Sequence, residues 1–342
     1  MIARFTEYWS TTETIFDPTV QRPICQLVIM LPGAGCEWAK KSGGCYMCGF
    51  SCATRKYSRG LLLPAAVFKV MIKKALSKNQ GIGSVAIYNG GSFLNPREIP
   101  ESVPIWLCKQ IEISKHVRQL FVESRPEFVD DVQIRTMVDS LGSKVLKVGI
   151  GLECATDFIR ERCVHKGFSL QEYSKAVQTL KSLGARILTY IFLKPLFLSE
   201  AEAIEEAVKT IVYAFEQGSD EVALESAFVQ KGTFMHRMFQ SGKFKPPWLW
   251  SIIEVVRRTY HLGFVHVGGF TDEPPPVATP ANCTKCSKLV KESLQKFREV
   301  HDIGVLDGLR CDCQAEWLSE LSREYVSLEE RTGSKPTTGA RL

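Results

Sequence analysis

Three cysteines in one glycine-rich stretch have the spacing of ligands to a soft metal centre. Cys36, Cys45 and Cys48 follow the pattern C-x8-C-x2-C, and Cys52 comes shortly afterwards. Thiolates are preferred ligands of zinc and of iron–sulfur clusters. Three thiolates leave one iron of a [4Fe–4S] cluster open to a substrate, whereas four would fully ligate a cluster or enclose a zinc ion. The spacing alone leaves these alternatives open.

A second group of cysteines lies near the end of the sequence, in two close pairs on either side of a charged, helix-length stretch. The pairs are Cys283 with Cys286 and Cys311 with Cys313. This spacing predicts a structural zinc with four thiolate ligands, and an auxiliary iron–sulfur cluster is the alternative. The basic residues nearby could also contact RNA phosphates. The four cysteines outside both groups are expected to be small buried side chains: Cys25, Cys108, Cys154 and Cys163.

The composition indicates a globular protein. The chain has 342 residues, is 45% hydrophobic and carries a net charge of +6, which permits an RNA partner without requiring one. No stretch reaches the roughly 20 apolar residues of a membrane helix, and no signal peptide is recognisable. We therefore expect a cytoplasmic protein with no membrane partner, in which clustered cysteines are ligands and not disulfides.

Six short apolar runs alternate with amphipathic stretches, which predicts parallel β/α units. Six units are too few for a closed eight-stranded barrel, so the expected fold class is α/β, an open partial (β/α)6 barrel with a small cysteine-rich extension. Because the runs are apolar throughout, we expect helices on one face and an apolar barrel interior on the other. The predicted strands are 26–31, 84–89, 118–123, 145–151, 186–193 and 221–226.

A change in composition near residue 270 predicts a boundary. Glycines at 268 and 269 and a proline run at 274–276 interrupt the alternation. We expect a core domain over 1–270, a metal-binding region over 271–331 and a disordered tail over 332–342.

Polar residues and glycines follow three of the predicted strands. Gly90 and Gly91 follow the second, Glu123 and Arg125 the third, and Glu153 the fourth. In parallel β/α folds, ligands bind at the carboxyl ends of the strands. These residues are therefore candidate ligand contacts.

Other polar and aromatic residues are given structural interpretations. His165, Lys166 and Lys194 lie near predicted strand or loop ends and are expected to be exposed polar residues, with a substrate contact as the alternative. Trp248 and Trp250 are expected to pack in the core from the start of a helix.

Residues 25 to about 270 resemble radical S-adenosylmethionine (SAM) enzymes of the branch that contains the catalytic subunit of Elongator. The long cysteine spacing is similar to that branch, residues 123–126 resemble its Glu-Thr-Arg-Pro element, and residues 149–153 resemble its next strand. Within the branch, the chain resembles the archaeal radical SAM family of archaeosine biosynthesis, and this resemblance covers most of the chain. It rests on three further segments: 43–49, 163–168 and 245–250.

The resemblance implies a set of roles for the candidate residues. Cys36, Cys45 and Cys48 would hold a [4Fe–4S] cluster whose open iron is chelated by SAM. Contacts to the amine, carboxylate or ribose of SAM would come from five residues: Gly90, Gly91, Glu123, Arg125 and Glu153. The sequence departs from the superfamily pattern at Met47, where an aromatic residue is common, and at Ser92, where a glutamate usually completes Gly-Gly-Glu.

The resemblance also implies a reaction and partners, while no catalytic residue is identified. The substrate would be tRNA carrying a lysine-modified 7-deazaguanine at position 15, and cleavage of a lysine C–N bond would give archaeosine. The enzyme, a radical SAM lyase, would work with the archaeosine synthase subunit that attaches the lysine. Two alternatives are another radical SAM tRNA-modifying enzyme, such as a methylthiotransferase, and a non-catalytic zinc-dependent RNA-binding module.

Overall fold

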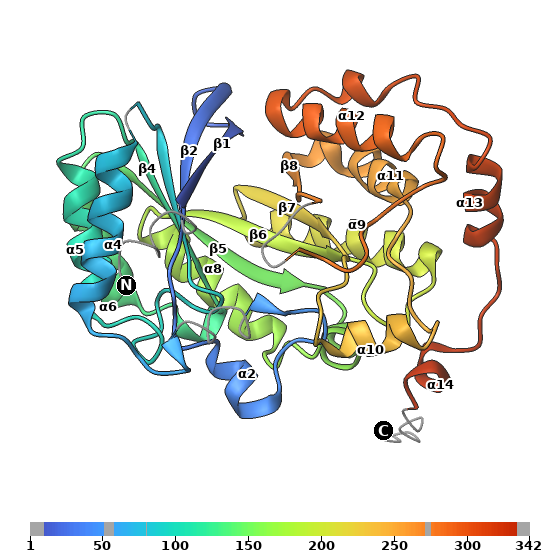
Figure 1. Cartoon of the computed structure of the whole chain (residues 1–342), viewed down its shortest axis with the longest axis horizontal. Helices are drawn as coiled ribbons and strands as arrows, with labels where there is room; N and C mark the ends of the chain where they lie inside the picture. The colour runs from blue at the N-terminus through green and yellow to red at the C-terminus, as the bar shows by residue number, and fades with distance from the viewer. Residues whose placement is uncertain (1–9, 51–57, 80, 271–274, 334–342) are drawn as a thin grey trace.

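The fold is built on a curled sheet of eight strands, seen in the computed structural model of Figure 1. The structure describes residues 10–50, 58–79, 81–270 and 275–333. The strands lie in chain order across the sheet; the first pair is antiparallel and the following pairs are parallel. The strands are β1 Ser10–Asp17, β2 Arg22–Met30, β3 Ser84–Tyr88, β4 Gln119–Ser124, β5 Val145–Glu153, β6 Arg186–Leu193, β7 Glu221–Ser226 and β8 Phe264–Val267.

The partial barrel expected from the sequence is confirmed, with two strands added at its edges. The six predicted strands correspond to β2 to β7, and the predicted bounds of β6 and β7 are those observed. The first added strand, β1, pairs antiparallel with β2 and begins with polar residues, three threonines and one glutamate among them, which is typical of an edge strand. The second, β8, has only four residues and directly precedes two glycines.

Helices cover the convex face of the sheet, as Figure 1 shows. Alternate residues of β3, β4 and β5 pack there with α4, α5, α6 and α8 in one hydrophobic cluster. The helices are α2 Glu37–Ser42, α4 Ala65–Lys78, α5 Ser102–Glu112, α6 Asp131–Leu141, α7 Asp157–Ile159, α8 Leu170–Ser182, α9 Glu200–Gln217, α10 Phe234–Gln240, α11 Leu249–Thr259, α12 Ser287–Val300, α13 Gln314–Leu321 and α14 Leu328–Thr332.

The concave face is not the apolar interior that the sequence predicted. A belt of apolar residues that includes Phe121 and Leu188 crosses it. Near the amino ends of the strands, however, the Glu221 carboxylate accepts hydrogen bonds from Lys147 and His266, both at 2.7 Å. Burial acts to raise the pKa of this carboxylate, but the charge of Lys147 and the hydrogen bonds from Lys147 and His266 lower it to about 2. The predicted strand segments seemed apolar throughout because each contains few charged residues, which face inward between aliphatic residues that face outward.

The C-terminal segment closes the open side of the partial barrel. Helix α12 contacts both edge strands, β1 and β8. The rings of Phe16 on β1 and Phe264 on β8 are stacked 6.0 Å apart, and both rings lie against His301 at the end of α12. Residues on both sides of the predicted boundary at 270 share one hydrophobic cluster. The division into domains remains a prediction.

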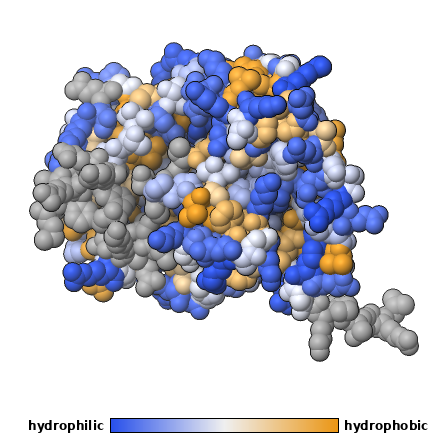
Figure 2. All heavy atoms as spheres, turned by 45° about the vertical axis from the view of Figure 1, so that its right-hand side comes forward, coloured by the Kyte–Doolittle hydropathy of each residue, from blue (hydrophilic) through white to orange (hydrophobic). Residues whose placement is uncertain are grey.

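The surface and the tail complete the description. Figure 2 shows a largely hydrophilic face on which the hydrophobic areas are small. Among the described residues, no helix has both the length and the apolar character to cross a lipid bilayer. Of the predicted tail, Thr332 ends α14, and residues 334–342 lie outside the described residues.

Candidate functional site

The first cysteine group lies at the carboxyl end of the barrel strands. Cys36 is the N-terminal cap of α2, and the chain leaves that helix at Gly43, whose φ of 87° is in the left-handed region that favours glycine. A turn then brings the amide of Cys48 to the carbonyl of Cys45 at 3.1 Å. The three cysteines are half-buried. Burial raises the pKa of the Cys45 thiol, while Lys166 and Arg125 act against the rise.

One buried carboxylate joins the cysteine loop to the glycine pair after β3. Glu98 accepts the amide of Glu37, the residue after Cys36, at 2.9 Å and the amide of Ser92 at 2.6 Å. A Cβ at Gly91 would lie 1.9 Å from the Glu98 carboxylate and 3.1 Å from Cys36 Cα. Only glycine fits at position 91, because these two segments approach so closely. The structure thus places a glutamate beside the glycine pair, where the sequence showed only Ser92.

The segment after β5 supports the cysteine loop from the other side. The indole of Trp38 donates to the His165 carbonyl at 2.9 Å, and the His165 ring pairs with the Gly44 carbonyl at 2.9 Å. That ring also stacks on Tyr46, with centroids 5.1 Å apart. The prediction that His165 is an exposed polar residue is therefore wrong: its ring is held between aromatic side chains of the cysteine loop.

Lys166 is also buried, which corrects the same prediction. Its ammonium donates to Glu153 at 2.7 Å, and Gly151 leaves the space for this pair, because a Cβ there would lie 2.6 Å from both groups. Glu153 has a φ of 67°, an uncommon value for a residue other than glycine. Although burial opposes it, Glu153 raises the pKa of Lys166, so the ammonium stays charged. Lys166 occupies one carboxylate oxygen of Glu153.

Arg125 presents an unused hydrogen-bond donor to this region. Its guanidinium lies 5.2 Å from the Trp38 ring and 5.4 Å from the Phe168 ring, and its Nε donates to Glu127 at 2.5 Å. The buried Nη2 has no hydrogen-bond partner. An unsatisfied buried guanidinium nitrogen is costly, so this nitrogen is suited to an anionic ligand. Arg125 lies close enough to Cys36 and Cys45 for its charge to act on both thiols, where it opposes the rise of their pKa.

Glu123 lies on the concave face, in different surroundings from Arg125. Burial raises its pKa to about 7, and the nearby Glu225 adds to the rise, whereas a hydrogen bond from Tyr190 and the charge of Lys166 oppose it. A carboxyl group with this pKa can be neutral or ionised near neutral pH. The structure therefore brings the cysteines, Gly91, Arg125 and Glu153 together around the loop, and sets Glu123 inside the barrel.

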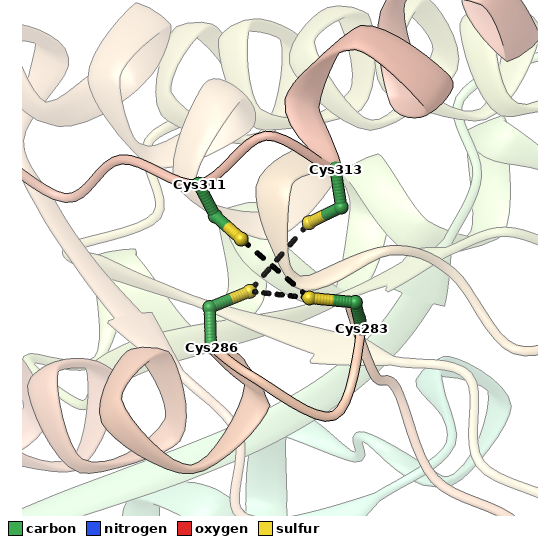
Figure 3. A group of neighbouring side chains, drawn as sticks. All are labelled: Cys283, Cys286, Cys311 and Cys313. Atoms are coloured by element: carbon green, nitrogen blue, oxygen red, sulfur yellow. Dashed lines mark hydrogen bonds between the residues drawn. The ribbon is translucent and has the colours of Figure 1, made fainter.

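The second cysteine group converges to the geometry of a single-ion site (Figure 3). Sγ of Cys283 lies 3.7 Å from that of Cys286 and 3.5 Å from that of Cys311, and Sγ of Cys286 lies 3.6 Å from that of Cys313. A tetrahedral zinc with bonds of about 2.3 Å separates its sulfurs by about 3.8 Å. The irons of a cluster hold their thiolates farther apart, so the spacing favours one ion. Within the described part of the chain, no other such group of three or more ligands occurs.

A buried network connects the C-terminal cysteines to the loop after β6. The indole of Trp250 donates to Cys313 Sγ at 3.4 Å, and the indole of Trp317 donates to Ser251 at 2.9 Å. Ser251 in turn donates to Glu200, which also pairs with Lys194. Lys194 is thus a half-buried partner of Glu200, and its predicted exposure is wrong. Trp250 lies in the core, as predicted.

The remaining cysteines follow the prediction except at one position. Cys108, Cys154 and Cys163 are buried, whereas Cys25 is exposed on β2. Cys25 pairs with Thr14 of β1, an edge strand, so its side chain is not covered by a helix layer. Cys52 lies outside the described residues.

Sequence reasoning missed Glu98, Trp38 and the role of Lys166. Glu98 binds an amide 61 positions away, and the Trp38 indole bonds a carbonyl 127 positions away. Pairings across such separations leave no local spacing pattern. The segment 163–168 was noticed only through the family resemblance.

Known proteins resemble this chain in sequence and in fold. The chain is 31% identical over 307 residues to archaeosine synthase subunit beta of Methanosarcina acetivorans, covering 87% of this chain and 85% of that protein. It is 27% identical over 320 residues to archaeosine synthase subunit beta of Thermococcus kodakarensis, covering 91% and 94%. Among solved structures, Elp3 of Methanocaldococcus infernus has a TM-score of 0.50 at 21% identity, over 72% of this chain and 60% of that one, a likeness of fold. No protein-family model matches the sequence. By its identity to the first of these relatives over most of both chains, this chain belongs to the archaeosine synthase subunit beta family.

Proposed function

We propose that this protein is a radical SAM enzyme that modifies tRNA, and that it forms archaeosine by cleaving a lysine C–N bond of lysine-modified 7-deazaguanine at position 15. The observation that carries the proposal is the site itself. Three cysteines lie at the mouth of a partial barrel, beside Gly91 and beside a buried arginine nitrogen without a partner. The names of the curated relatives support the choice of archaeosine as the product.

The residues at this mouth suit a four-iron cluster and SAM. Cys36, Cys45 and Cys48 would hold the cluster, and they do not converge to the single-ion spacing of the C-terminal group. Arg125 would offer its free Nη2 to the carboxylate of SAM. When bound, the two groups would supply one-electron cleavage of a carbon–sulfur bond and hydrogen abstraction from an unactivated C–H bond.

The chain's own residues would hold and orient these groups. Glu98 fixes the loop of Cys36 against Gly91, whose backbone would face the amine of SAM. Glu153 keeps one oxygen free of Lys166 and could accept a ribose hydroxyl. Glu123 lies inside the barrel, where its carboxyl could contact either SAM or the substrate.

The C-terminal cysteines would bind a structural zinc. The spacing of their sulfurs supports a mononuclear tetrahedral site over an auxiliary cluster. Although burial acts in the opposite direction, hydrogen bonds from Cys311 and from the Cys286 backbone lower the pKa of the Cys283 thiol to about 7. The pKa of Cys286 and of Cys311 is raised, so Cys283 would be the first of these thiols to supply the thiolate that zinc needs. The word "subunit" in the relatives' names supports a second protein as partner, for which the lysine-attaching subunit is our proposal.

The test is an anaerobic assay with tRNA that carries the lysine-modified base. We expect 5′-deoxyadenosine and archaeosine to form together, detected by mass spectrometry of nucleosides. A product gaining a methylthio group would identify the alternative methylthiotransferase. Protein that binds tRNA and zinc but no iron after anaerobic reconstitution would instead be the non-catalytic RNA-binding module, and the proposal would be abandoned.

A further inference from the structure

One segment of the chain is basic and free of acidic residues. Residues 226–253 contain no aspartate or glutamate, although the whole chain has 37 of them. The segment carries four basic side chains, all exposed: Lys231, Arg237, Lys243 and Lys245. We call these four residues the basic rim. They extend from the loop after β7, through α10, to the residues that precede α11.

The basic rim is not neutralised by the rest of the protein. None of its four side chains forms an ion pair with a carboxylate of the described residues. Exposed cations elsewhere behave differently: Lys41 and Arg97 both pair with Glu37, at 2.5 Å and 2.6 Å. The charge of the basic rim therefore stays available for an external anion.

Aromatic rings hold two of these cations in place. The Arg237 guanidinium lies 5.1 Å from the centre of the Phe234 ring, and the Lys245 ammonium lies 5.0 Å from that of Trp248. Both rings are half-buried, so each offers a supported apolar edge beside its cation. A cation positioned by a ring, without a carboxylate partner, suits phosphate, and nearby rings suit nucleobases.

The basic rim borders the cysteine loop. The amide of Met235 donates to the Tyr46 carbonyl at 3.0 Å, and the Phe234 and Tyr46 rings are 4.7 Å apart. The amide of Gly49 donates to Gln230 at 2.7 Å. Figure 1 shows α10 and α2 at the same end of the molecule, opposite the β1–β2 hairpin and α12. An RNA bound at the basic rim would therefore lie next to the site that would act on one of its bases.

We propose that the basic rim is a binding surface for the tRNA backbone, with phosphates contacting Lys231, Arg237, Lys243 and Lys245. The inference rests on the proposed tRNA function and locates its substrate. Phosphate contacts position an RNA without reading its sequence, so the basic rim would supply affinity, while the barrel mouth would select the modified base.

The experiment compares two quadruple alanine variants of the full chain. The test variant replaces the basic rim, and the control replaces four exposed lysines on the helical convex side: Lys73, Lys78, Lys109 and Lys115. Affinity for tRNA is measured by fluorescence anisotropy between 50 and 300 mM salt. We expect the test variant to bind at least about tenfold more weakly near 0.15 M salt, and the slope of log K against log salt to fall by about 3. The control should bind like the wild type.

A second measurement separates this inference from the proposed function. Uncoupled 5′-deoxyadenosine formation without tRNA should be the same in both variants, because the basic rim contains none of the cluster or SAM residues. Equal affinities and slopes for the two variants would overturn the inference and leave the tRNA function standing. Wild-type protein that binds no tRNA would refute both. Undiminished tRNA binding with lost binding to the partner subunit would assign the basic rim to a protein contact, and the inference would be wrong.

Discussion

Replacing Glu98 by glutamine should damage the site without changing its shape. One carboxylate oxygen accepts Glu37 N at 2.9 Å and Asn95 Nδ2 at 3.0 Å; the other accepts Ser92 N at 2.6 Å and Asn89 Nδ2 at 3.4 Å. A glutamine side chain keeps one of these two oxygens as an acceptor. In place of the other it has an NH2 group, which cannot accept the two N–H donors that face it. At least two hydrogen bonds to a charged acceptor are lost, each contributing about 1.5–3 kcal/mol.

Part of this loss is offset by desolvation. Burial raises the pKa of Glu98, which shows that the ionised carboxylate is held at a cost that a neutral amide avoids. We therefore expect the free energy of unfolding to fall by a net of about 1–3 kcal/mol. The variant would also weaken the hydrogen bonds through which Glu98 joins the loop of Cys36 to the loop of Gly91. Because Cys36 is a proposed cluster ligand, the iron content after anaerobic reconstitution should fall.

Chemical denaturation and iron analysis provide the assay. Glu101→Gln is the matched control, because Glu101 is an exposed glutamate nearby on the same segment and its side chain makes no capping hydrogen bond. If Glu98→Gln matched this control in both stability and iron content, the reasoning that Glu98 holds the two loops together would be refuted.

Three further predictions concern the cysteines and a half-buried histidine. Cys45→Ala should abolish reductive cleavage of SAM while the circular dichroism spectrum stays native; continued 5′-deoxyadenosine production would contradict the ligand assignment. Cys283→Ala should remove one equivalent of bound zinc and lower the melting temperature by several degrees, whereas Cys25→Ala at the exposed cysteine should do neither. Burial lowers the pKa of His301 from 6.5 to about 4, so the unfolded chain binds more protons than the native state between these values. Stability should fall as the pH falls from about 6.5 to 4, and His301→Phe should remove about 1 kcal/mol of that fall, allowing for partial exposure; unchanged pH dependence in denaturation curves would count against it.

The sequence was sufficient for the central strands and for the convergence of the C-terminal cysteines. Although single charged residues face the barrel interior, the residues that pack under the helix layer are apolar, so β6 and β7 could be bounded correctly. The C-terminal quartet was predictable because two close pairs leave few geometries other than a common centre.

The remainder depended on contacts between distant segments. The edge strand β1 begins with five consecutive polar residues and has only two apolar residues in a row, so its composition does not separate it from a loop. Lys166 and Lys194 were expected at the surface because isolated lysines usually lie there. Lys166 is buried and Lys194 half-buried, because each pairs with a carboxylate, Glu153 or Glu200. Such partners become visible only when the strands are placed side by side.

The position of α12 also protects the edges of the sheet from pairing with other molecules. An open sheet has two borders with unpaired backbone groups, each a template for strands of another molecule. Here the last part of the chain lies against both borders, through Phe16, Phe264 and His301. Shortening the chain at residue 270 would uncover both borders at once, and the shortened protein should aggregate on expression even if every residue of the cysteine loop were intact.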